Sequence, residues 1–182
     1  MEFIPTAIPD VILIRPRVFE DSRGHFFESW EERKFAAAGL DVRFRQENQN
    51  RSGRHVLRGL HYQLRRPQGK LVRVATGAAF DVAVDLRRSS ATFGQWVGAD
   101  LTQDNHHMLW VPAGFAHGFV VLGESAHFLY KCTDFYDPED ERVIAWDDPD
   151  LKIDWRLPPG TAPVLSERDR GAIRFCDADV YL

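Results

Sequence analysis

Residues 56–63 read VLRGLHYQ and, after a short turn, residues 69–74 read GKLVRV. Most of these residues favour strands, yet the two segments carry Arg58, His61 and Lys70. A histidine can accept a proton near neutral pH, an arginine suits a phosphate, and a lysine suits a developing oxyanion. The pattern predicts two strands that bring a base and two cations to a pocket for an anionic substrate that loses a proton. This stretch alone leaves an alternative open, in which both cations are solvated and His61 has a structural role.

Short strands are predicted along most of the chain. Runs of β-branched and aromatic residues recur about every ten residues, separated by Gly, Ser, Asn or Pro turns. Residues 11–14 predict an early strand, and a turn at 21–24 leads into residues 25–29. The spacing is typical of an all-β sandwich or barrel. After the opening stretch the runs are residues 79–85, 95–99, 108–111, 118–122 and 127–131.

One convincing helix is predicted, over residues 31–38, which are mostly good helix formers. Ser29 and Glu32 form a capping-box pattern at its start. Gly39 stands where a C-terminal cap is expected.

The segments around this helix and at the C-terminus are more polar. The strand pattern resumes at residues 42–46, and the polar run QENQN at 46–50 predicts a solvated loop. Beyond Trp146 the sequence is rich in Asp, Pro and Gly, which predicts a loop-rich tail wrapped over the barrel. Within that tail Ser166 is expected to cap a short terminal helix.

Composition excludes several classes of protein. A length of 182 residues suits one domain with a full hydrophobic core, so residues 1–182 are predicted to form a single domain. A formal net charge of -4 argues against a nucleic-acid partner. Cys132 and Cys176 are too few for a disulfide framework and show no zinc spacing, so a reducing cytoplasm is expected. No signal peptide or membrane-spanning apolar run is present, so no membrane partner is expected.

A second histidine follows a tight turn at residues 112–119, PAGFAHGF. Pro and Gly set the bend, so His117 is held by stiff backbone. The sequence pattern Pro-x-Gly-x-x-His between two strands resembles the second motif of cupins, which are small jelly-roll barrels with a site in the barrel mouth. The first cupin motif usually reads His-x-His followed by Glu and helps to hold a metal, whereas residues 61–63 read His-Tyr-Gln. The usual metal ligands are incomplete, so we expect no catalytic metal and a His61 free to take protons.

Motifs for nucleotide cofactors and for nucleophilic catalysis are also absent. No GxGxxG follows a strand, and there is no P-loop and no GxSxG elbow. The reaction that remains is proton transfer at a carbon beside a carbonyl, with a base, an oxyanion stabiliser and an acid. Tyr130 on a predicted strand is a suitable acid, and the alternative for it is a core aromatic with a satisfied hydroxyl.

Several motifs in one order resemble the dTDP-4-dehydrorhamnose 3,5-epimerase family of the cupin superfamily. The resemblance runs from about Thr6 to about Asp169, nearly the whole chain. It implies an all-β, cupin-type jelly-roll barrel (a double-stranded β-helix) with a short N-terminal helix and a C-terminal tail of loops and a short helix. The motifs are residues 56–63, 69–73, 81–85, 92–96, 112–119, 128–131 and 165–169.

Enzymes of this family invert carbons 3 and 5 of a dTDP-linked 4-keto-6-deoxyhexose, on the route to dTDP-L-rhamnose. Both carbons flank the keto group, so loss of either proton gives an enolate, and reprotonation from the other face inverts the centre. The resemblance implies no cofactor and four catalytic residues. They are His61 as the base, Asp169 orienting it, Lys70 holding the enolate oxygen and Tyr130 returning the proton.

Other residues match the family's substrate contacts. Tyr136 matches an aromatic that stacks on thymine, and the preceding Phe135, where a second tyrosine occurs in relatives, stays open as the alternative stacking ring. Arg168 stands where some relatives have a lysine, and it retains the charge that attracts phosphate. The remaining matches are Arg23 and Arg58 at the diphosphate and sugar, Glu28, Gln46 and Asn48 at the nucleotide end, His117 beside the substrate, and Glu141 near the base or phosphate.

The resemblance further implies a homodimer in which an N-terminal segment containing Arg23 and Phe26 reaches the neighbour's site. Other functions stay open at this point. An epimerase acting only at carbon 3 or only at carbon 5 would keep the same catalytic residues. A non-catalytic cupin that binds a nucleotide sugar would be expected to lose at least one of them. Gln63 speaks against a metal-dependent cupin oxygenase, and Tyr130 against a ketoisomerase.

Overall fold

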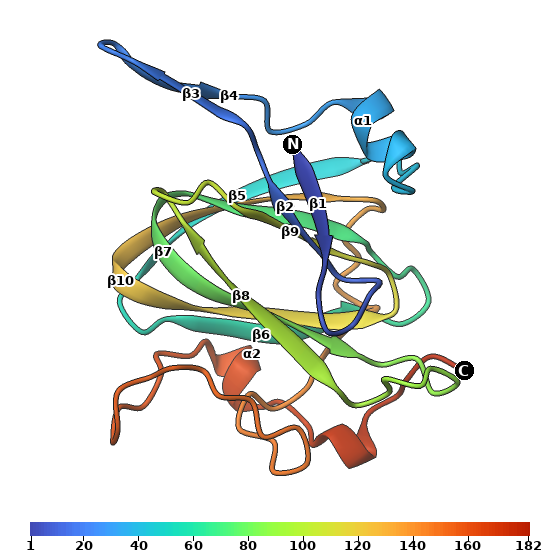
Figure 1. Ribbon diagram of the computed structural model, residues 1–182. Coiled ribbons are helices and arrows are strands. Elements are labelled where there is room, and N and C mark those ends of the chain that lie inside the picture. Colours follow the sequence, from blue (N-terminus) through green and yellow to red (C-terminus); the bar gives the residue numbers. More distant parts are fainter.

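The chain folds into a β-barrel of two facing layers (Figure 1). The computed structural model describes residues 1–182. Its strands are β1 (Glu2–Pro5), β2 (Ile12–Arg15), β3 (Val18–Asp21), β4 (Gly24–Phe27), β5 (Gln46–Gly53), β6 (Leu57–Gln63), β7 (Lys70–Asp85), β8 (Trp96–Thr102), β9 (Met108–Val111), β10 (Phe115–Cys132) and β11 (Glu141–Val143). Its helices are α1 (Glu32–Ala37), α2 (Glu167–Arg170) and the 3-10 turn η1 (Phe175–Asp177). The all-β architecture predicted from the sequence is confirmed.

Strands β7 and β10 join the two layers, because they pair antiparallel along most of their length and bend together. β7 pairs with β9 near its start and with β8 near its end, while β10 pairs with β6 and then with β5. The register of the pair shifts after Val121, where Gly77 has a φ of +84° and a Cβ would lie 1.9 Å from the Ser125 carbonyl oxygen. Such an irregularity bends a strand without ending its ladder. The prediction of separate strands at 118–122 and 127–131 is therefore wrong.

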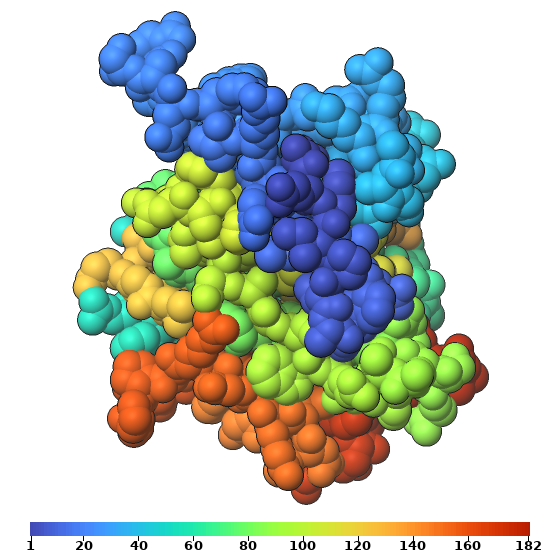
Figure 2. All heavy atoms as spheres, in the orientation of Figure 1, coloured from blue at the N-terminus to red at the C-terminus, as the bar shows by residue number.

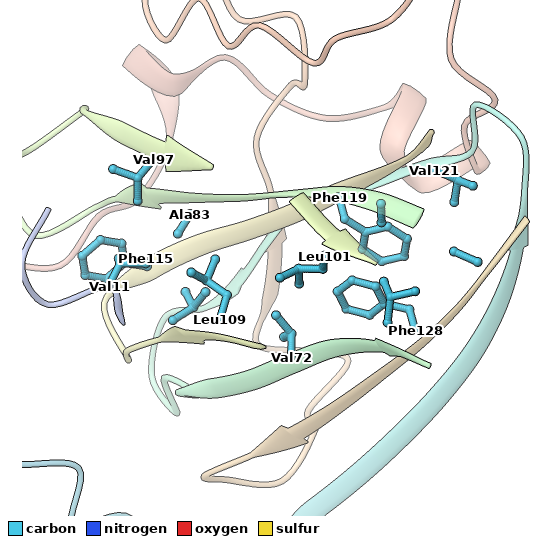
Figure 3. Close-up of a cluster of buried hydrophobic side chains, with 14 of the residues drawn as sticks. Val11, Val72, Ala83, Val97, Leu101, Leu109, Phe115, Phe119, Val121 and Phe128 are labelled. Carbon is cyan, nitrogen blue, oxygen red and sulfur yellow. The ribbon is translucent and has the colours of Figure 1, made fainter. Parts of the chain in front are cut away.

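The core lies between the two layers, and Figure 3 shows its side chains pointing toward one another from both of them. Phe119 and Phe128 stack with their ring centroids 4.0 Å apart, and Val72 and Leu109 are fully buried beside them. Burying a side chain of this size contributes about 1.5–3 kcal/mol. Phe119 and Phe128 also line the cavity described below, so the core fixes part of the wall of the site.

The C-terminal tail covers the outer face of one layer and is drawn in orange and red in Figure 1. Leu60 of β6 and Trp155 of the tail belong to one buried cluster. Asp148, 2% exposed, fixes the tail by accepting the backbone N–H of Phe175 at 2.8 Å. Both predictions for this region, a loop-rich tail over the barrel and a short helix capped by Ser166, are confirmed.

Helix α1 lies within the predicted range, but its start differs. The N-cap is Glu31, whose carboxylate accepts backbone N–H groups two and three residues later at 3.3 and 3.1 Å. The predicted capping box of Ser29 and Glu32 is therefore wrong, because a glutamate nearer the helix satisfies the free N–H groups. Gly39 follows the helix with a φ of +84°, as expected of a residue past a C-terminus. No helix of the chain is long and apolar enough to cross a membrane.

The polar segment after α1 differs from both predictions. Residues 42–45 have no regular structure, whereas the expected loop at 46–50 is the start of β5, which pairs with β10. Gln46, Asn48 and Asn50 are half-buried, while the residues between them are exposed. This alternation is that of a strand, and its polar inner face lines a cavity instead of the core.

Strands β3 and β4 form a separate hairpin that projects from the barrel in Figures 1 and 2. Its turn confirms the one predicted at residues 21–24. Phe19 and Phe26 are 51% and 70% exposed on it. The hairpin thus carries large apolar side chains that the rest of the chain does not cover.

Candidate active site

A polar cavity of about 490 Å³ lies inside the barrel. Strands β5, β6, β7 and β10 form its walls, and α2 and the segment before β11 lie at its mouth. Of the fourteen residues predicted for a site, eleven line this cavity: Gln46, Asn48, Arg58, His61, Lys70, His117, Tyr130, Tyr136, Glu141, Arg168 and Asp169. The other residues that line it are Gln49, Asn50, Gln68, Phe119, Phe128 and Ser166.

His61 of β6 and Asp169 of α2 form a hydrogen-bonded pair. His61 Nε2 lies 2.6 Å from Asp169 Oδ1, and Asp169 is 3% exposed. Ser166 Oγ donates to Asp169 Oδ2 at 2.6 Å, and the Gly59 N–H donates to Oδ1 at 3.3 Å. Burial acts to raise the pKa of Asp169, but the hydrogen bonds, led by those from His61 and Ser166, outweigh it and hold that pKa below its ordinary value. The ionised carboxylate accepts the Nε2 proton, which leaves His61 Nδ1 as the nitrogen with the free lone pair.

Two local features bring this pair together. Ser166 caps α2 by accepting the N–H of Asp169 at 3.1 Å, so the first turn of the helix presents the carboxylate to β6. On β6, Gly59 has a φ of +118°, and a Cβ there would lie 2.6 Å from the His117 carbonyl oxygen. Only glycine permits this close approach of β6 to β10, which places His61 opposite His117 in the register.

Lys70 and Tyr130 bring a cation and a phenol to the same cavity. Lys70 begins β7, and its ammonium group makes no hydrogen bond or ion pair with another residue. Burial lowers the pKa of Lys70. Tyr130 lies on β10 opposite Asn48 of β5. Burial raises the pKa of Tyr130, while its hydrogen bond with Asn48 acts in the other direction, so the phenol is protonated at neutral pH.

His117 and Arg58 are anchored by residues of the barrel. His117 Nε2 lies 2.9 and 3.1 Å from the two carboxylate oxygens of Asp81, which is fully buried on β7. Arg58 Nε donates to Ser52 Oγ at 3.0 Å, and its two terminal nitrogens make no hydrogen bond within the chain. The cavity therefore contains two imidazoles, each held by its own carboxylate, together with two cations.

Tyr136, Glu141 and Arg168 form a cluster at the mouth of the cavity. The Tyr136 hydroxyl donates to Glu141 Oε2 at 3.0 Å and accepts from Arg168 Nη1 at 3.1 Å. Arg168 and Glu141 also form an ion pair. Phe135, the other aromatic considered for stacking, is 53% exposed and does not line the cavity. The mouth thus presents one aromatic ring and one cation.

Three predicted residues lie outside the cavity of their own chain. Arg23 pairs with Asp21 in the turn of the hairpin, and Phe26 is exposed on the same hairpin. Glu28 pairs with Lys34 of α1 at 2.7 Å. The single chain does not bring these residues together with His61.

The cavity histidines do not form part of a three-residue metal cluster. Nowhere in residues 1–182 are three or more His, Cys, Asp or Glu side chains grouped so that they could hold a metal ion. Gln63 occupies the place of the second cupin histidine, and its amide group bonds to the backbone of Arg66, Phe135 and Asp137. This position therefore fixes the loops beside the mouth of the cavity.

Sequence reasoning missed several residues of this arrangement. Asp81 was visible as a single charge inside the apolar run AAFDVAV, where an unpaired carboxylate is costly to bury. Ser166 was assigned only as a helix cap, although its hydroxyl also binds the side chain of Asp169. The polar wall residues Gln49 and Asn50 were missed because their strand was predicted to be a loop.

Comparisons with known proteins were made for the whole chain. The sequence model described as dTDP-4-dehydrorhamnose 3,5-epimerase matches residues 5–177. The dTDP-4-dehydrorhamnose 3,5-epimerase of Pseudomonas aeruginosa is 62% identical over 176 residues, which are 96% of each chain. Among solved structures, the epimerase RmlC of Legionella pneumophila in complex with dTDP-4-keto-L-rhamnose has a TM-score of 0.94 and 47% identity, and the match covers 98% of this chain and 94% of that one. ChmJ, a 3'-monoepimerase from Streptomyces bikiniensis in complex with dTDP-quinovose, has a TM-score of 0.88 and 32% identity, with 94% and 87% covered.

The barrel, its cavity and these similarities define a carbohydrate epimerase with a cupin-type fold. An imidazole held by a carboxylate, an unpaired cation and a phenol are groups that can supply the base, the oxyanion stabiliser and the acid that inversion beside a carbonyl requires. The chain belongs to the dTDP-4-dehydrorhamnose 3,5-epimerase family. The resemblance inferred from the sequence motifs is confirmed.

Proposed function

We propose that this epimerase inverts carbons 3 and 5 of dTDP-4-dehydro-6-deoxy-D-glucose, giving dTDP-4-dehydro-L-rhamnose, and that His61 is its base. The observation that carries the proposal is the 2.6 Å contact between His61 Nε2 and the buried Asp169 carboxylate. It fixes the tautomer in which Nδ1 can take a proton, and it stabilises the imidazolium that forms.

In the first step His61 Nδ1 takes the proton from carbon 5 or carbon 3. The electron pair of the broken C–H bond forms the C=C bond of an enolate, and negative charge develops on the oxygen at carbon 4. The Lys70 ammonium, which has no protein partner, stabilises this oxygen. A cation with no partner in the chain can turn fully toward the charge that appears in the transition state.

In the second step Tyr130 donates its phenolic proton to the opposite face of the same carbon, which inverts the centre. The tyrosinate then regains a proton and the imidazolium loses one, both through water, so the site is reset for the second carbon. Because burial raises the pKa of Tyr130, the phenol keeps its proton until the enolate forms.

Substrate binding is assigned to the rest of the cavity. Arg58 contacts the diphosphate and sugar, and Arg168 attracts phosphate, because both guanidinium groups face the cavity. Tyr136 stacks on thymine at the mouth. Gln46 and Asn48 bind the nucleotide end, His117 lies beside the sugar, and Glu141 lies near the base or phosphate.

Solvent deuterium incorporation tests the catalytic roles. The protein is incubated with the 4-keto-6-deoxyglucose nucleotide in heavy water, and proton NMR follows carbons 3 and 5. The wild type is expected to incorporate deuterium at both carbons with inversion. His61→Asn should exchange neither, whereas Tyr130→Phe should exchange without inversion, because His61 can return a proton to the face it came from. Exchange by His61→Asn at the wild-type rate would contradict the proposal, and wild-type exchange at carbon 3 alone would indicate a monoepimerase.

We further propose a homodimer in which the β3–β4 hairpin completes the neighbour's cavity. Arg23 and Phe26 match substrate contacts in sequence but lie on an exposed hairpin outside their own cavity. Glu28, at the base of the hairpin, also lies outside it. A two-fold related partner would receive these residues at its own site.

Mixed dimers test this arrangement. Two inactive variants are mixed, the single variant His61→Asn and the double variant Arg23→Ala/Phe26→Ala, and each alone is expected to be nearly inactive. A heterodimer of the two would contain one site with both defects and one intact site. Random exchange of subunits should therefore restore about a quarter of the wild-type activity. A mixture that stays inactive although light scattering shows exchanged dimers would disprove the crossover, and a fully active monomer would disprove the dimer.

We place the protein in the cytoplasm and assign residues 1–182 to one functional domain. Its two cysteines are free thiols, and Cys176 is exposed, which suits a reducing compartment. The net charge of -4 supports a small anionic ligand held by local cations instead of a nucleic-acid partner.

A further inference from the structure

Arg58 is held differently from the other two arginines assigned to the substrate. Arg23 and Arg168 each pair with a carboxylate of this chain, whereas no acidic side chain pairs with Arg58. Instead, Arg58 Nε donates to Ser52 Oγ at 3.0 Å. The charge of the Arg58 guanidinium is therefore not neutralised within the chain, and its two terminal nitrogens are free to bind a ligand in the cavity.

Ser52 is fixed in place by the strand on which it lies. It is 3% exposed on β5, opposite the buried Ala126 of β10. Its hydroxyl donates its one proton to Asn50 Oδ1 at 3.1 Å, so a lone pair is left to accept from Arg58. Ser52 does not line the cavity, so it acts on a ligand only through the side chains that it holds.

A neutral acceptor suits this position better than a charged one. A guanidinium has five N–H donors in a rigid fork, and a bond at Nε leaves the two terminal nitrogens as a pair that fits a phosphate. A carboxylate would hold the same Nε but would also neutralise the cation and repel a diphosphate. A serine hydroxyl fixes the direction of the fork and leaves its full charge to the ligand. An arginine that is ordered beforehand also loses less side-chain entropy when the ligand binds.

We propose that Ser52 is a positioning residue for the substrate's diphosphate: it orders the Arg58 guanidinium before the ligand binds, so that both terminal nitrogens face the phosphate oxygens. The inference rests on the diphosphate contact proposed for Arg58. It does not depend on which carbon is inverted, because the diphosphate does not take part in the proton transfers. Ser52 therefore acts on binding of the nucleotide and not on the chemical step.

Binding of dTDP, measured by calorimetry, tests the proposal without any turnover. Ser52→Ala should raise the Kd for dTDP about tenfold, as expected for a lost hydrogen bond to a charged group. Adding Ser52→Ala to Arg58→Ala should have no further effect on that Kd, because the side chain that Ser52 orders is already absent. Ser125→Ala is the matched control and should bind dTDP as the wild type does, since this serine of the neighbouring strand lies outside the cavity.

Steady-state kinetics distinguish positioning from a general structural defect. With the nucleotide sugar as substrate, Ser52→Ala should raise KM about tenfold and change kcat by less than about twofold, because the diphosphate contact is the same in the ground and transition states. Three results would each overturn the proposal: an unchanged Kd for dTDP in Ser52→Ala, an equal further loss in the Arg58→Ala background, or a fall confined to kcat.

A third measurement uses the unaltered protein and does not depend on the folding of a variant under test. Proton–nitrogen NMR of the arginine side chains should show the Arg58 Nε–H group ordered and slow to exchange with water in the ligand-free protein. Arg51, an exposed residue of the same strand as Ser52, is the internal reference for a mobile side chain. An Arg58 Nε–H group as mobile as that of Arg51 would overturn the inference. Wild-type protein that binds dTDP but exchanges neither carbon 3 nor carbon 5 would contradict the proposed reaction alone.

Discussion

Replacing Asp169 with asparagine tests whether the carboxylate charge behind His61 drives proton abstraction. The amide is the same size and can keep its oxygen toward His61 Nε2 and the Gly59 N–H, at the positions 2.6 and 3.3 Å away. The amide nitrogen then faces Ser166, whose hydroxyl must turn to accept a hydrogen bond. In this orientation the geometry of the pair survives and only the charge is lost.

The size of the effect follows from this contact. At a heavy-atom separation of 2.6 Å the two charge centres lie about 4 Å apart, and they attract by roughly 4 kcal/mol at an effective dielectric constant near 20. The His61 side chain is 26% exposed, and solvent reduces the attraction to about 2–4 kcal/mol. Because the imidazolium exists only after proton abstraction, kcat should fall roughly 30- to 1000-fold. If the amide turns its nitrogen toward His61, the proton moves to Nδ1 and the fall approaches about 10⁴-fold, as for a wrong tautomer in a catalytic triad.

The assay combines turnover with deuterium exchange at carbons 3 and 5, since both should slow together when abstraction is impaired. Binding of dTDP, measured by calorimetry, should stay unchanged. Ser166→Ala is the matched control, because it removes a hydrogen bond to Asp169 but keeps the carboxylate, and it should lower kcat only about tenfold. A kcat for Asp169→Asn within threefold of the wild type, or equal losses in the two variants, would refute the reasoning.

Three further changes test the barrel that supports the site. Gly59→Ala should lower the free energy of unfolding, measured in urea, by about 3 kcal/mol or more, because the new Cβ would lie 2.6 Å from the backbone of β10. Gly160→Ala is the control: its Cβ would contact no other atom, and the loss should be only about 1 kcal/mol. Burial acts to raise the pKa of Asp85, but hydrogen bonds led by those from Arg87 outweigh it and lower this pKa to about 2. The ionised Asp85 should therefore stabilise the protein above pH 4, and about 1–2 kcal/mol of that stabilisation should be lost between pH 4 and 2. Asp85→Asn should lack this acid-dependent loss. Phe128→Ala should destabilise the protein by about 3–5 kcal/mol and also slow turnover, because the ring packs on Phe119 in the cavity wall; normal turnover at unchanged stability would contradict this.

The residues around His61 could be predicted from sequence because local rules agree there. The segments carrying Arg58 and Lys70 are rich in residues that favour strands, and the turn before His117 contains the Pro and Gly that a bend requires. The polar strand β5 was missed because strand prediction relies on burial in an apolar core, whereas Asn48 and its neighbours face a polar cavity. The continuity of β10 was missed because the irregularity between Val121 and Ala126 depends on the pairing with β7 at Gly77.

Long-range pairing was beyond local rules altogether. His61 and Asp169 are 108 positions apart, and no periodicity connects them. Only the family resemblance brought them together before the fold was known. Asp81 shows the opposite case: its position in an apolar strand was a local signal, but its meaning depends on His117, which the topology places beside it.

The two histidine–carboxylate pairs of the cavity differ in where their carboxylates come from. Asp81 belongs to β7 and is buried among core residues, so it stays in place as long as the barrel is folded. Asp169 comes from α2 in the tail, and its carboxylate contacts β6 through the hydrogen bonds to His61 and Gly59. Local opening of the tail would therefore separate the base from its carboxylate while leaving Lys70 and Asp81 in place. In the proposed mechanism the carboxylate that supports the base therefore depends on the position of α2, whereas the carboxylate that holds His117 belongs to the barrel itself.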